Sequence, residues 1–315
     1  MSSDTGLVLI AHGTVDSLDD LPEFLTNIRR GHAPSPELLA EVRRRYEAIG
    51  GRSPLNDVTR EAARKLEARL GVPTRMAMRL FRPYPREVLS ELAGLGVRRV
   101  VVLPLAQHSA PLYNEAVKQA AREVPGIEEV RGAPNWGREP ALTEAFAESI
   151  AEALDRLPAA GGEETALVLT AHSLPVSVIE AGDPYEREVR ASAEDVAAAV
   201  RARRPGAFAE HVVSFQSQGM STGPGGRPVA WLGPDLRATL EGLAGKGVRR
   251  VVVAPIGFLA DHVEILYDLD IEARAWAEEL GMVLERSASL NASDRLVGVL
   301  AAVAERVLAR ADGEG

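Results

Sequence analysis

The chain has 315 residues, 46% of them hydrophobic, which is enough apolar material for one large domain or for two ordinary domains with cores of their own. Its net charge of −9 argues against nucleic acid as a partner, because phosphate binding favours a basic surface. The absence of cysteine excludes disulfides, zinc–cysteine sites and cysteine-ligated iron–sulfur clusters.

Strands and helices alternate along the chain, which predicts an α/β fold with mainly parallel sheets. In the first half we expect strands at about 6–11, 74–80, 97–104 and 127–132, and helices near 18–30, 36–48, 56–71, 84–94, 112–124 and 138–157. Residues 158–163 are expected to form a linker. In the second half we expect strands near 166–171, 211–216, 248–255 and 282–286, and helices near 185–203, 235–246, 262–280 and 293–311.

No apolar run has the length of a membrane span. The apolar stretch at residues 6–11 is too short for a signal peptide and lacks a basic flank. We therefore expect a cytoplasmic monomer, and peripheral contact with a membrane stays open.

Two pairs of similar segments indicate an internal duplication. Residues 7–12 (LVLIAH) and 167–172 (LVLTAH) are identical at five of six positions, and residues 92–104 and 243–255 are identical at eleven of thirteen. Chance similarity between buried strands does not produce eleven matches in order. Each half therefore begins with a strand that ends in a histidine, and the halves are long enough to be domains.

The expected architecture is a pair of Rossmann-like domains, each with a mainly parallel four-stranded sheet flanked by helices. Eight strands also fit a (β/α)₈ barrel, but the linker and the histidine after each first strand favour two doubly wound domains. We expect an N-terminal half at 1–157 and a C-terminal half with the metal site at 164–292. A C-terminal helix at 293–315 can pack back on the N-terminal half.

His12 and His172 are candidate site residues because of their position. Each ends a buried strand, and open parallel sheets bind ligands at the carboxyl ends of their strands. The first strand leads into Ala-His-Gly-Thr, so the sequence has no Gly-rich phosphate loop there, and it has no nucleophile elbow either. Nucleotide binding and serine hydrolysis are therefore disfavoured.

An acidic stretch follows the strand at 248–255. Glu264, Asp268 and Glu272 are four residues apart on a predicted helix, so their carboxylates share one face and repel unless a cation or a basic partner lies among them. For Asp268 and Glu272 the alternative is a solvated acidic face near a helix N-terminus. A histidine facing a carboxylate can bind a divalent metal or accept protons. Tyr113 takes the place of Glu264 in the first half, so we expect the chemistry mainly in the second.

Several short stretches carry a family resemblance: 46–55 (YEAIGGRSPL), 77–79 (AMR), 171–175 (AHSLP), 182–185 (GDPY), 215–217 (FQS), 231–234 (WLGP), 255–258 (PIGF) and 261–264 (DHVE). Together they resemble the ferrochelatases over nearly the whole chain. This resemblance implies an enzyme that inserts Fe²⁺ into a porphyrin at the end of haem synthesis, with the porphyrin in a cleft between two Rossmann-like domains. It implies Fe²⁺ as substrate and no permanently bound cofactor.

The resemblance also implies roles for single residues. His172 matches the metal-site histidine and Glu264 its partner carboxylate. Asp268 and Glu272 match an acidic line that leads to the site. The positions expected to contact the porphyrin and its propionates are His12, Arg29, Arg45, Tyr46 and Ser53.

The segments 28–31 and 45–49 look most like the coproporphyrin III ferrochelatases of Gram-positive bacteria. We therefore expect coproporphyrin III as the favoured substrate, with protoporphyrin IX as the alternative. The chain departs from that subtype at His12 and at Trp136-Gly137, where those enzymes usually carry tyrosine.

Two other functions stay open. Ala-His-Gly-Thr is similar to a motif of the small cobalt chelatases, so cobalt insertion into sirohydrochlorin is a rival activity. A non-enzymatic porphyrin or haem carrier is the second alternative. His172 and Glu264 argue against the carrier, because binding alone requires no base.

Overall fold

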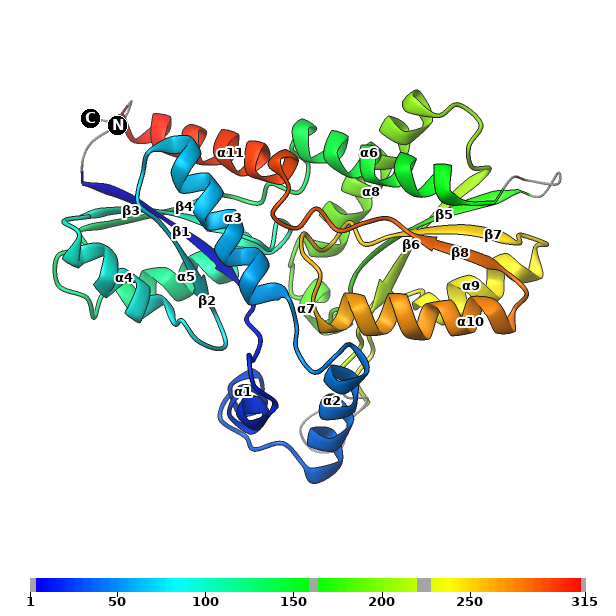
Figure 1. Ribbon diagram of the computed structural model, residues 1–315, viewed down its shortest axis with the longest axis horizontal. Coiled ribbons are helices and arrows are strands. Elements are labelled where there is room, and N and C mark those ends of the chain that lie inside the picture. Colours follow the sequence, from blue (N-terminus) through cyan, green and yellow to red (C-terminus); the bar gives the residue numbers. More distant parts are fainter. Residues whose placement is uncertain (1–3, 159–163, 220–227, 313–315) are drawn as a thin grey trace. The chain divides into compact units, whose positions relative to one another are not determined.

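The computed structural model describes residues 4–158, 164–219 and 228–312 (Figure 1). The chain forms two compact units. Unit 1 comprises residues 1–136, 260–263 and 291–315, and unit 2 comprises residues 137–259 and 264–290. Among the described residues, no helix is both long enough and apolar enough to span a membrane.

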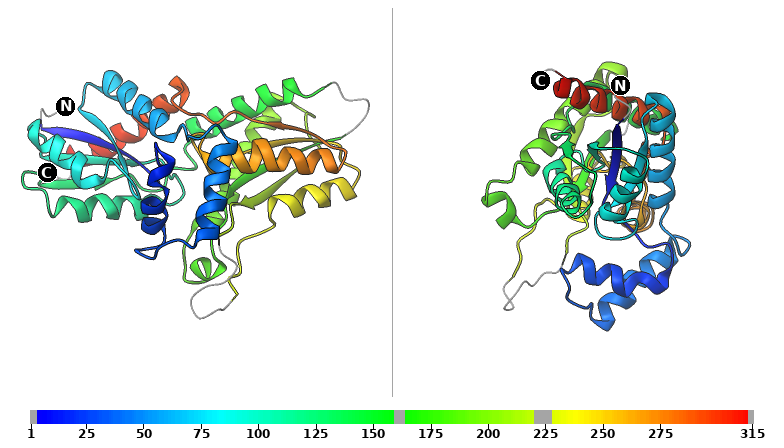
Figure 2. Two further views of the ribbon diagram at one scale, coloured as in Figure 1. Left: turned by 60° about the horizontal axis from the view of Figure 1, so that its bottom comes forward. Right: turned by 90° about the vertical axis from the view of Figure 1, so that its left-hand side faces the viewer.

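Unit 1 is built on a parallel sheet with the strand order β2-β1-β3-β4. Its strands are β1 (Thr5–Ala11), β2 (Thr74–Met78), β3 (Arg99–Pro104) and β4 (Glu129–Gly132). Its helices are η1 (Leu18–Asp20), α1 (Leu21–Ile28), α2 (Pro36–Ala48), α3 (Leu55–Leu70), α4 (Pro85–Gly94), α5 (Ala110–Ala121) and α11 (Asp294–Asp312). Helices α4 and α5 cover one face of the sheet, and α3 and α11 cover the other (Figures 1 and 2).

Unit 2 repeats this plan with the strand order β6-β5-β7-β8. Its strands are β5 (Thr165–His172), β6 (Glu210–Gln216), β7 (Arg250–Ala254) and β8 (Val283–Arg286). Its helices are α6 (Pro140–Arg156), α7 (Val176–Glu180), α8 (Tyr185–Arg203), α9 (Leu236–Gly245), η3 (Ile265–Ala273) and α10 (Arg274–Glu279). The expected fold, with two four-stranded parallel sheets, is confirmed, and two separate sheets exclude the barrel.

The two sheets have equivalent cores, as the duplication predicts. Val8 pairs with Val102 in unit 1, and Val168 pairs with Val253 in unit 2. All four side chains are fully buried and pack under the helices on the same face of their sheet. Each buried valine contributes about 1.5–3 kcal/mol to stability, so the repeated apolar strings hold the strands in the same register in both units.

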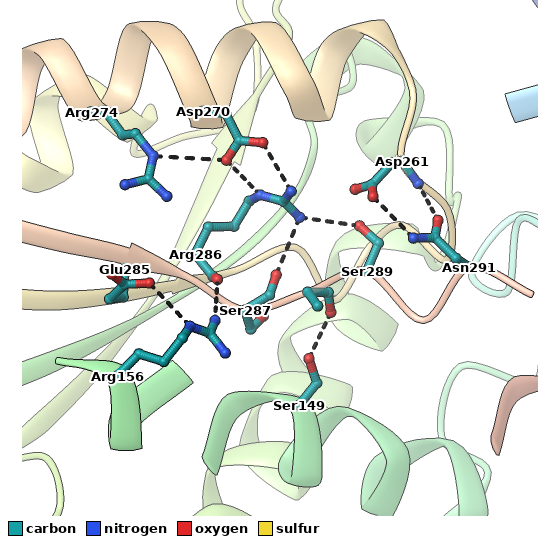
Figure 3. Close-up of polar contacts among 11 residues, drawn as sticks. Ser149, Arg156, Asp261, Asp270, Arg274, Glu285, Arg286, Ser287, Ser289 and Asn291 are labelled. Carbon is teal, nitrogen blue, oxygen red and sulfur yellow. Dashed lines mark hydrogen bonds and ion pairs between the residues drawn. The ribbon is translucent and has the colours of Figure 1, made fainter. Parts of the chain in front are cut away.

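The helix that follows the fourth strand of each half belongs to the unit of the other half. Helix α6 follows β4 but packs on α8, β7 and β8, and Ser149 Oγ donates a hydrogen bond of 2.6 Å to the Ala288 carbonyl (Figure 3). Helix α11 follows β8 but packs on α3 and β3, and Lys65 Nζ lies 2.7 Å from Asp294. The division therefore falls after Trp136 and not at the expected residue 157, because α6 buries its apolar face on the second sheet.

The helix expected at 262–280 is a π-helix over Ile265–Ala273 and an α-helix only from Arg274 to Glu279. Its i→i+5 hydrogen bonds shift the side chains along the helix face, and such turns occur often at functional sites. The linker expected at 158–163 lies outside the described residues, apart from Pro158.

Candidate active site at the end of strand β5

Strand β5 is central in its sheet and delivers His172 at its carboxyl end. It pairs with β6 on one side and β7 on the other, and its other seven residues are buried. The His172 carbonyl accepts a hydrogen bond of 2.9 Å from Tyr185 Oη, and the His172 side chain is 37% exposed. The backbone is thus held firmly while the imidazole stays accessible.

The turn after β7 lies directly against β5 because residue 257 is glycine. Gly257 N donates to the Thr170 carbonyl at 2.9 Å, and a Cβ atom at Gly257 would lie 2.5 Å from the Cβ of Ala171. Any side chain here would push the turn away from the strand. The turn places the ring of Phe258 with its centroid 6.4 Å from that of His172, so an apolar ring flanks the imidazole.

Glu264 lies immediately before η3 and is the first residue of unit 2 after the chain returns from unit 1. Ile265 and Leu269 are fully buried in the core of unit 2 and anchor the helix that begins here. The start of a helix favours a carboxylate, because its free N–H groups carry partial positive charge. Glu264 Oε2 lies 3.6 Å from His172 Nε2, and the Glu264 side chain is 33% exposed.

The hydrogen bond on the other ring nitrogen determines the tautomer of His172. Nδ1 lies 2.5 Å from the Ser173 carbonyl oxygen, which can only accept, so Nδ1 carries the proton. In the neutral ring, Nε2 then presents its lone pair to the Glu264 carboxylate. Two acceptors that face each other at 3.6 Å are stabilised when a proton or a cation lies on one of them. The pair is therefore suited to proton uptake or to contact with a metal ion.

Asp268 and Glu272 lie further along the same helical segment. Asp268 is only 6% exposed, and its carboxylate accepts a hydrogen bond of 2.5 Å from Ser217 Oγ. Ser217 adopts a φ of 58°, which turns the chain after β6. Asp268 is thus not part of a solvated acidic face, whereas Glu272 is half-buried.

The structure brings His172 and Glu264 together but does not gather the whole expected ligand set. In residues 4–158, 164–219 and 228–312, no three histidine, aspartate or glutamate side chains cluster closely enough to hold a metal ion. The predicted metal residues therefore form one close pair, with two carboxylates further along the chain.

A second pair occupies the equivalent place in unit 1. His12 Nδ1 lies 3.2 Å from Tyr113 Oη, and these residues correspond to His172 and Glu264 in the two repeats. His12 is exposed, and the Arg79 guanidinium lies 5.8 Å from the centroid of the Tyr113 ring. The duplication has thus preserved the pairing while replacing the carboxylate by a phenol.

Tyr46 and Ser53 are both buried in unit 1. Tyr46 Oη lies 2.6 Å from Thr14 Oγ1, and its ring packs with Leu21 and Phe24. Ser53 has no exposed surface. The hydroxyl contact of Tyr46 ties helix α2 to the segment that follows His12.

Arg29 and Arg45 lie at the ends of the two neighbouring helices α1 and α2. Arg45 Nε donates to Glu41 Oε1 at 2.9 Å, and this hydrogen bond holds the pKa of the Glu41 carboxyl below its usual range. A carboxylate ligand of Arg45 must therefore share the guanidinium with Glu41 or displace it.

Two other histidines lie in partly or fully buried surroundings. His262 Nδ1 lies 3.1 Å from the Ala260 carbonyl. His108 is buried, and burial lowers its pKa to about 4. Sequence reasoning did not single out Tyr185 or Phe258, although both lie in stretches that carried the family resemblance.

The protein has an α/β fold with two similar units, and this fold is of the chelatase-like class. A solved structure, SirB from Bacillus subtilis with Fe³⁺, has this fold, with a TM-score of 0.59, 11% sequence identity and 98% of both chains covered.

Sequence comparison identifies the family. Residues 4–308 match the model of the family Ferrochelatase. A ferrochelatase of Acidobacterium capsulatum is 37% identical, with 98% of this chain and 96% of the relative covered. A coproporphyrin III ferrochelatase of Anoxybacillus flavithermus is 33% identical, with 98% of each chain covered. The chain belongs to the ferrochelatase family and is an enzyme of the lyase class.

Proposed function

We propose that this protein inserts Fe²⁺ into a porphyrin in haem synthesis and that coproporphyrin III is its favoured substrate over protoporphyrin IX. The observation that supports this most directly is that His172 Nε2 lies 3.6 Å from Glu264 Oε2 while Nδ1 contacts the Ser173 carbonyl oxygen. Membership of the family supports the reaction. Relatives named coproporphyrin III ferrochelatase support the choice of porphyrin.

His172 is the proton acceptor in this proposal. A porphyrin must lose two pyrrole N–H protons as the metal enters, and a neutral imidazole accepts protons effectively near pH 7. Protonation of Nε2 would place an imidazolium beside the Glu264 carboxylate, so the product of the first transfer is stabilised by its neighbour. Glu264 can then take or relay the second proton.

The metal must also shed water before it reaches the ring nitrogens. Asp268 and Glu272 follow Glu264 at intervals of four residues, and we propose that they attract the hydrated cation along this helix. Binding energy from the rest of the porphyrin can stabilise a bent macrocycle, in which the nitrogen lone pairs are exposed.

The porphyrin propionates are assigned to unit 1. Arginine offers a planar fork that matches a carboxylate, so Arg29 and Arg45 are the proposed anchors, with Tyr46 and Ser53 supporting the same region. Coproporphyrin III carries four propionates and protoporphyrin IX carries two, so the first substrate gains more from such anchors. His12 is proposed to contact the macrocycle itself.

Metal insertion assays test this function. The purified protein is supplied with Fe²⁺ or Co²⁺ and with coproporphyrin III, protoporphyrin IX or sirohydrochlorin, and the metallated product is followed by absorbance. We expect the highest kcat/KM for Fe²⁺ with coproporphyrin III. A preference for Co²⁺ and sirohydrochlorin would replace the proposal by the rival chelatase, and tight porphyrin binding without turnover would replace it by a carrier.

A further inference from the structure

Gln216, the last residue of strand β6, has a buried side-chain amide that meets no hydrogen-bond partner among the described residues. The residue is 4% exposed. Neither Oε1 nor Nε2 has a hydrogen-bond partner among the residues that the structure describes. A buried polar group without a partner is costly, and most such groups in proteins are hydrogen-bonded to protein or to ordered water.

The parallel register places this amide beside the proposed metal-site histidine. Gln216 is the pairing partner of His172, and its backbone carbonyl accepts a hydrogen bond of 2.8 Å from Ser173 N. Matched residues on neighbouring strands lie about 4.8 Å apart and point to the same face of the sheet. The Gln216 side chain therefore lies on the face from which His172 meets Glu264.

The polar character of this face increases toward the site. Two residues earlier on each strand, and on the same face, Thr170 is paired with Ser214, whose Oγ accepts a hydrogen bond of 3.1 Å from Thr239 Oγ1. Two residues earlier again, Val168 is paired with Val212 in the apolar core. The buried amide thus lies in the outermost layer, where a ligand at His172 would be within reach.

We propose that Gln216 is a substrate-contacting residue whose amide binds the water shell of the divalent metal ion as that ion passes His172 and Glu264. This inference rests on the proposed function. Oε1 can accept a hydrogen bond from metal-bound water, and the Nε2 amino group can donate to water outside the first shell. The contacts compensate for hydration that the ion loses as it leaves bulk solvent.

A neutral amide suits an ion that must move on. A carboxylate at this position would add a charge beside Glu264 and bind the cation more tightly. An ion in transit must be bound strongly enough to enter and weakly enough to leave. Glutamine meets both conditions, because it solvates the ion without adding net charge.

The test compares two variants. Gln216→Met removes the amide but keeps a side chain of similar length, and Gln216→Glu adds a negative charge but keeps the shape of the side chain. Thr170→Val is the matched control, because Thr170 Oγ1 is also buried without a partner among the described residues but lies one layer deeper. Thermal unfolding, Co²⁺ binding by calorimetry, and kcat and kcat/KM for Fe²⁺ at saturating porphyrin are measured for each variant.

Gln216→Met should raise the melting temperature by about 2 °C, because it removes an unsatisfied group, as should Thr170→Val. It should also lower Co²⁺ affinity and kcat/KM for Fe²⁺ by about tenfold, as expected for a lost hydrogen bond to a charged ligand, whereas Thr170→Val should leave both unchanged. Gln216→Glu should tighten Co²⁺ binding and lower kcat.

Two results would overturn this role. One is unchanged Co²⁺ affinity and activity in Gln216→Met, and the other is a lowered melting temperature, which would indicate a structural partner for the amide. The proposed function fails separately, when the wild-type protein inserts no iron into any porphyrin. Co²⁺ binding by wild type and variants still tests Gln216 in that case.

Discussion

His172 donates its Nδ1 proton to a backbone carbonyl and presents Nε2 to Glu264 Oε2 at 3.6 Å. If this pair accepts the pyrrole protons, His172→Ala should lower the rate of metal insertion by about 10²–10⁴-fold, the usual contribution of a positioned acid or base. The fold should survive, because the side chain is partly exposed. Single-turnover insertion kinetics and circular dichroism measure the two effects.

His211→Ala is the matched control for that variant. His211 Nε2 lies 3.0 Å from Glu194, so it is also a histidine–glutamate pair of unit 2, but it lies near the start of β6. We expect normal insertion in His211→Ala. Insertion at the wild-type rate by a folded His172→Ala variant would refute the assignment.

The acidic residues beyond Glu264 should affect the metal more than the porphyrin. Asp268→Asn combined with Glu272→Gln removes two negative charges and should raise KM for Fe²⁺ by about tenfold, given Coulomb interactions at an effective dielectric constant near 20. KM for the porphyrin should change little. Added salt should weaken metal uptake by the wild type more than by the double variant, since screening acts on charge. Equal effects on both substrates would contradict a cation path.

Arg45 should distinguish the two porphyrins. A hydrogen bond to a charged group contributes roughly 1.5–3 kcal/mol, so Arg45→Ala should lower affinity for coproporphyrin III about tenfold or more. The effect on protoporphyrin IX should be smaller. Arg44→Ala is the control, because Arg44 is bonded to the same Glu41 but points to solvent. An equal loss for both porphyrins would contradict the proposed substrate preference, though not the chelatase activity.

Arg286 should stabilise the helix that begins at Glu264. Its Nε and Nη2 atoms donate to the two carboxylate oxygens of Asp270 at 2.7 and 2.9 Å, and its side chain is only 12% exposed (Figure 3). Lysine cannot form this fork, so Arg286→Lys should cost about 1–3 kcal/mol of unfolding free energy. Arg274 lies 4.0 Å from the same carboxylate and is more exposed, so Arg274→Lys should be nearly neutral. Chemical denaturation measures both, and similar losses in the two variants would argue against the clamp.

His108 should make the protein less stable in mild acid. Burial lowers its pKa from 6.5 to about 4, so between these values the unfolded chain binds a proton that the folded chain excludes. Its contribution to stability is complete above pH 6.5 and is lost as the pH falls toward 4, by about 3 kcal/mol in total. The unfolding free energy of the wild type should therefore fall relative to that of His108→Gln as the pH is lowered from 7 to 4.5. A difference independent of pH would contradict this origin.

The sequence by itself determined the repeated α/β design and the position of His172. Apolar strings such as those around Val8 and Val168 are local patterns, and a strand that is buried on both faces requires them whatever its neighbours are. The carboxyl end of such a strand is a ligand position in any open parallel sheet, so His172 could be identified as a candidate from the sequence alone. The pairing with Glu264 was predicted from the repeat and the family resemblance together.

The tertiary structure decided how the elements are shared and how the site is filled. The apolar face of α6 shows that the helix is covered, but not by which sheet, so its place in unit 2 could not be predicted, whereas the packing of α11 on the first half was expected. The π-helical segment and the contact between Ser217 and Asp268 depend on packing between distant segments. The same holds for Gln216, which is polar in sequence but buried in the fold, because burial is a property of the neighbours that tertiary packing supplies.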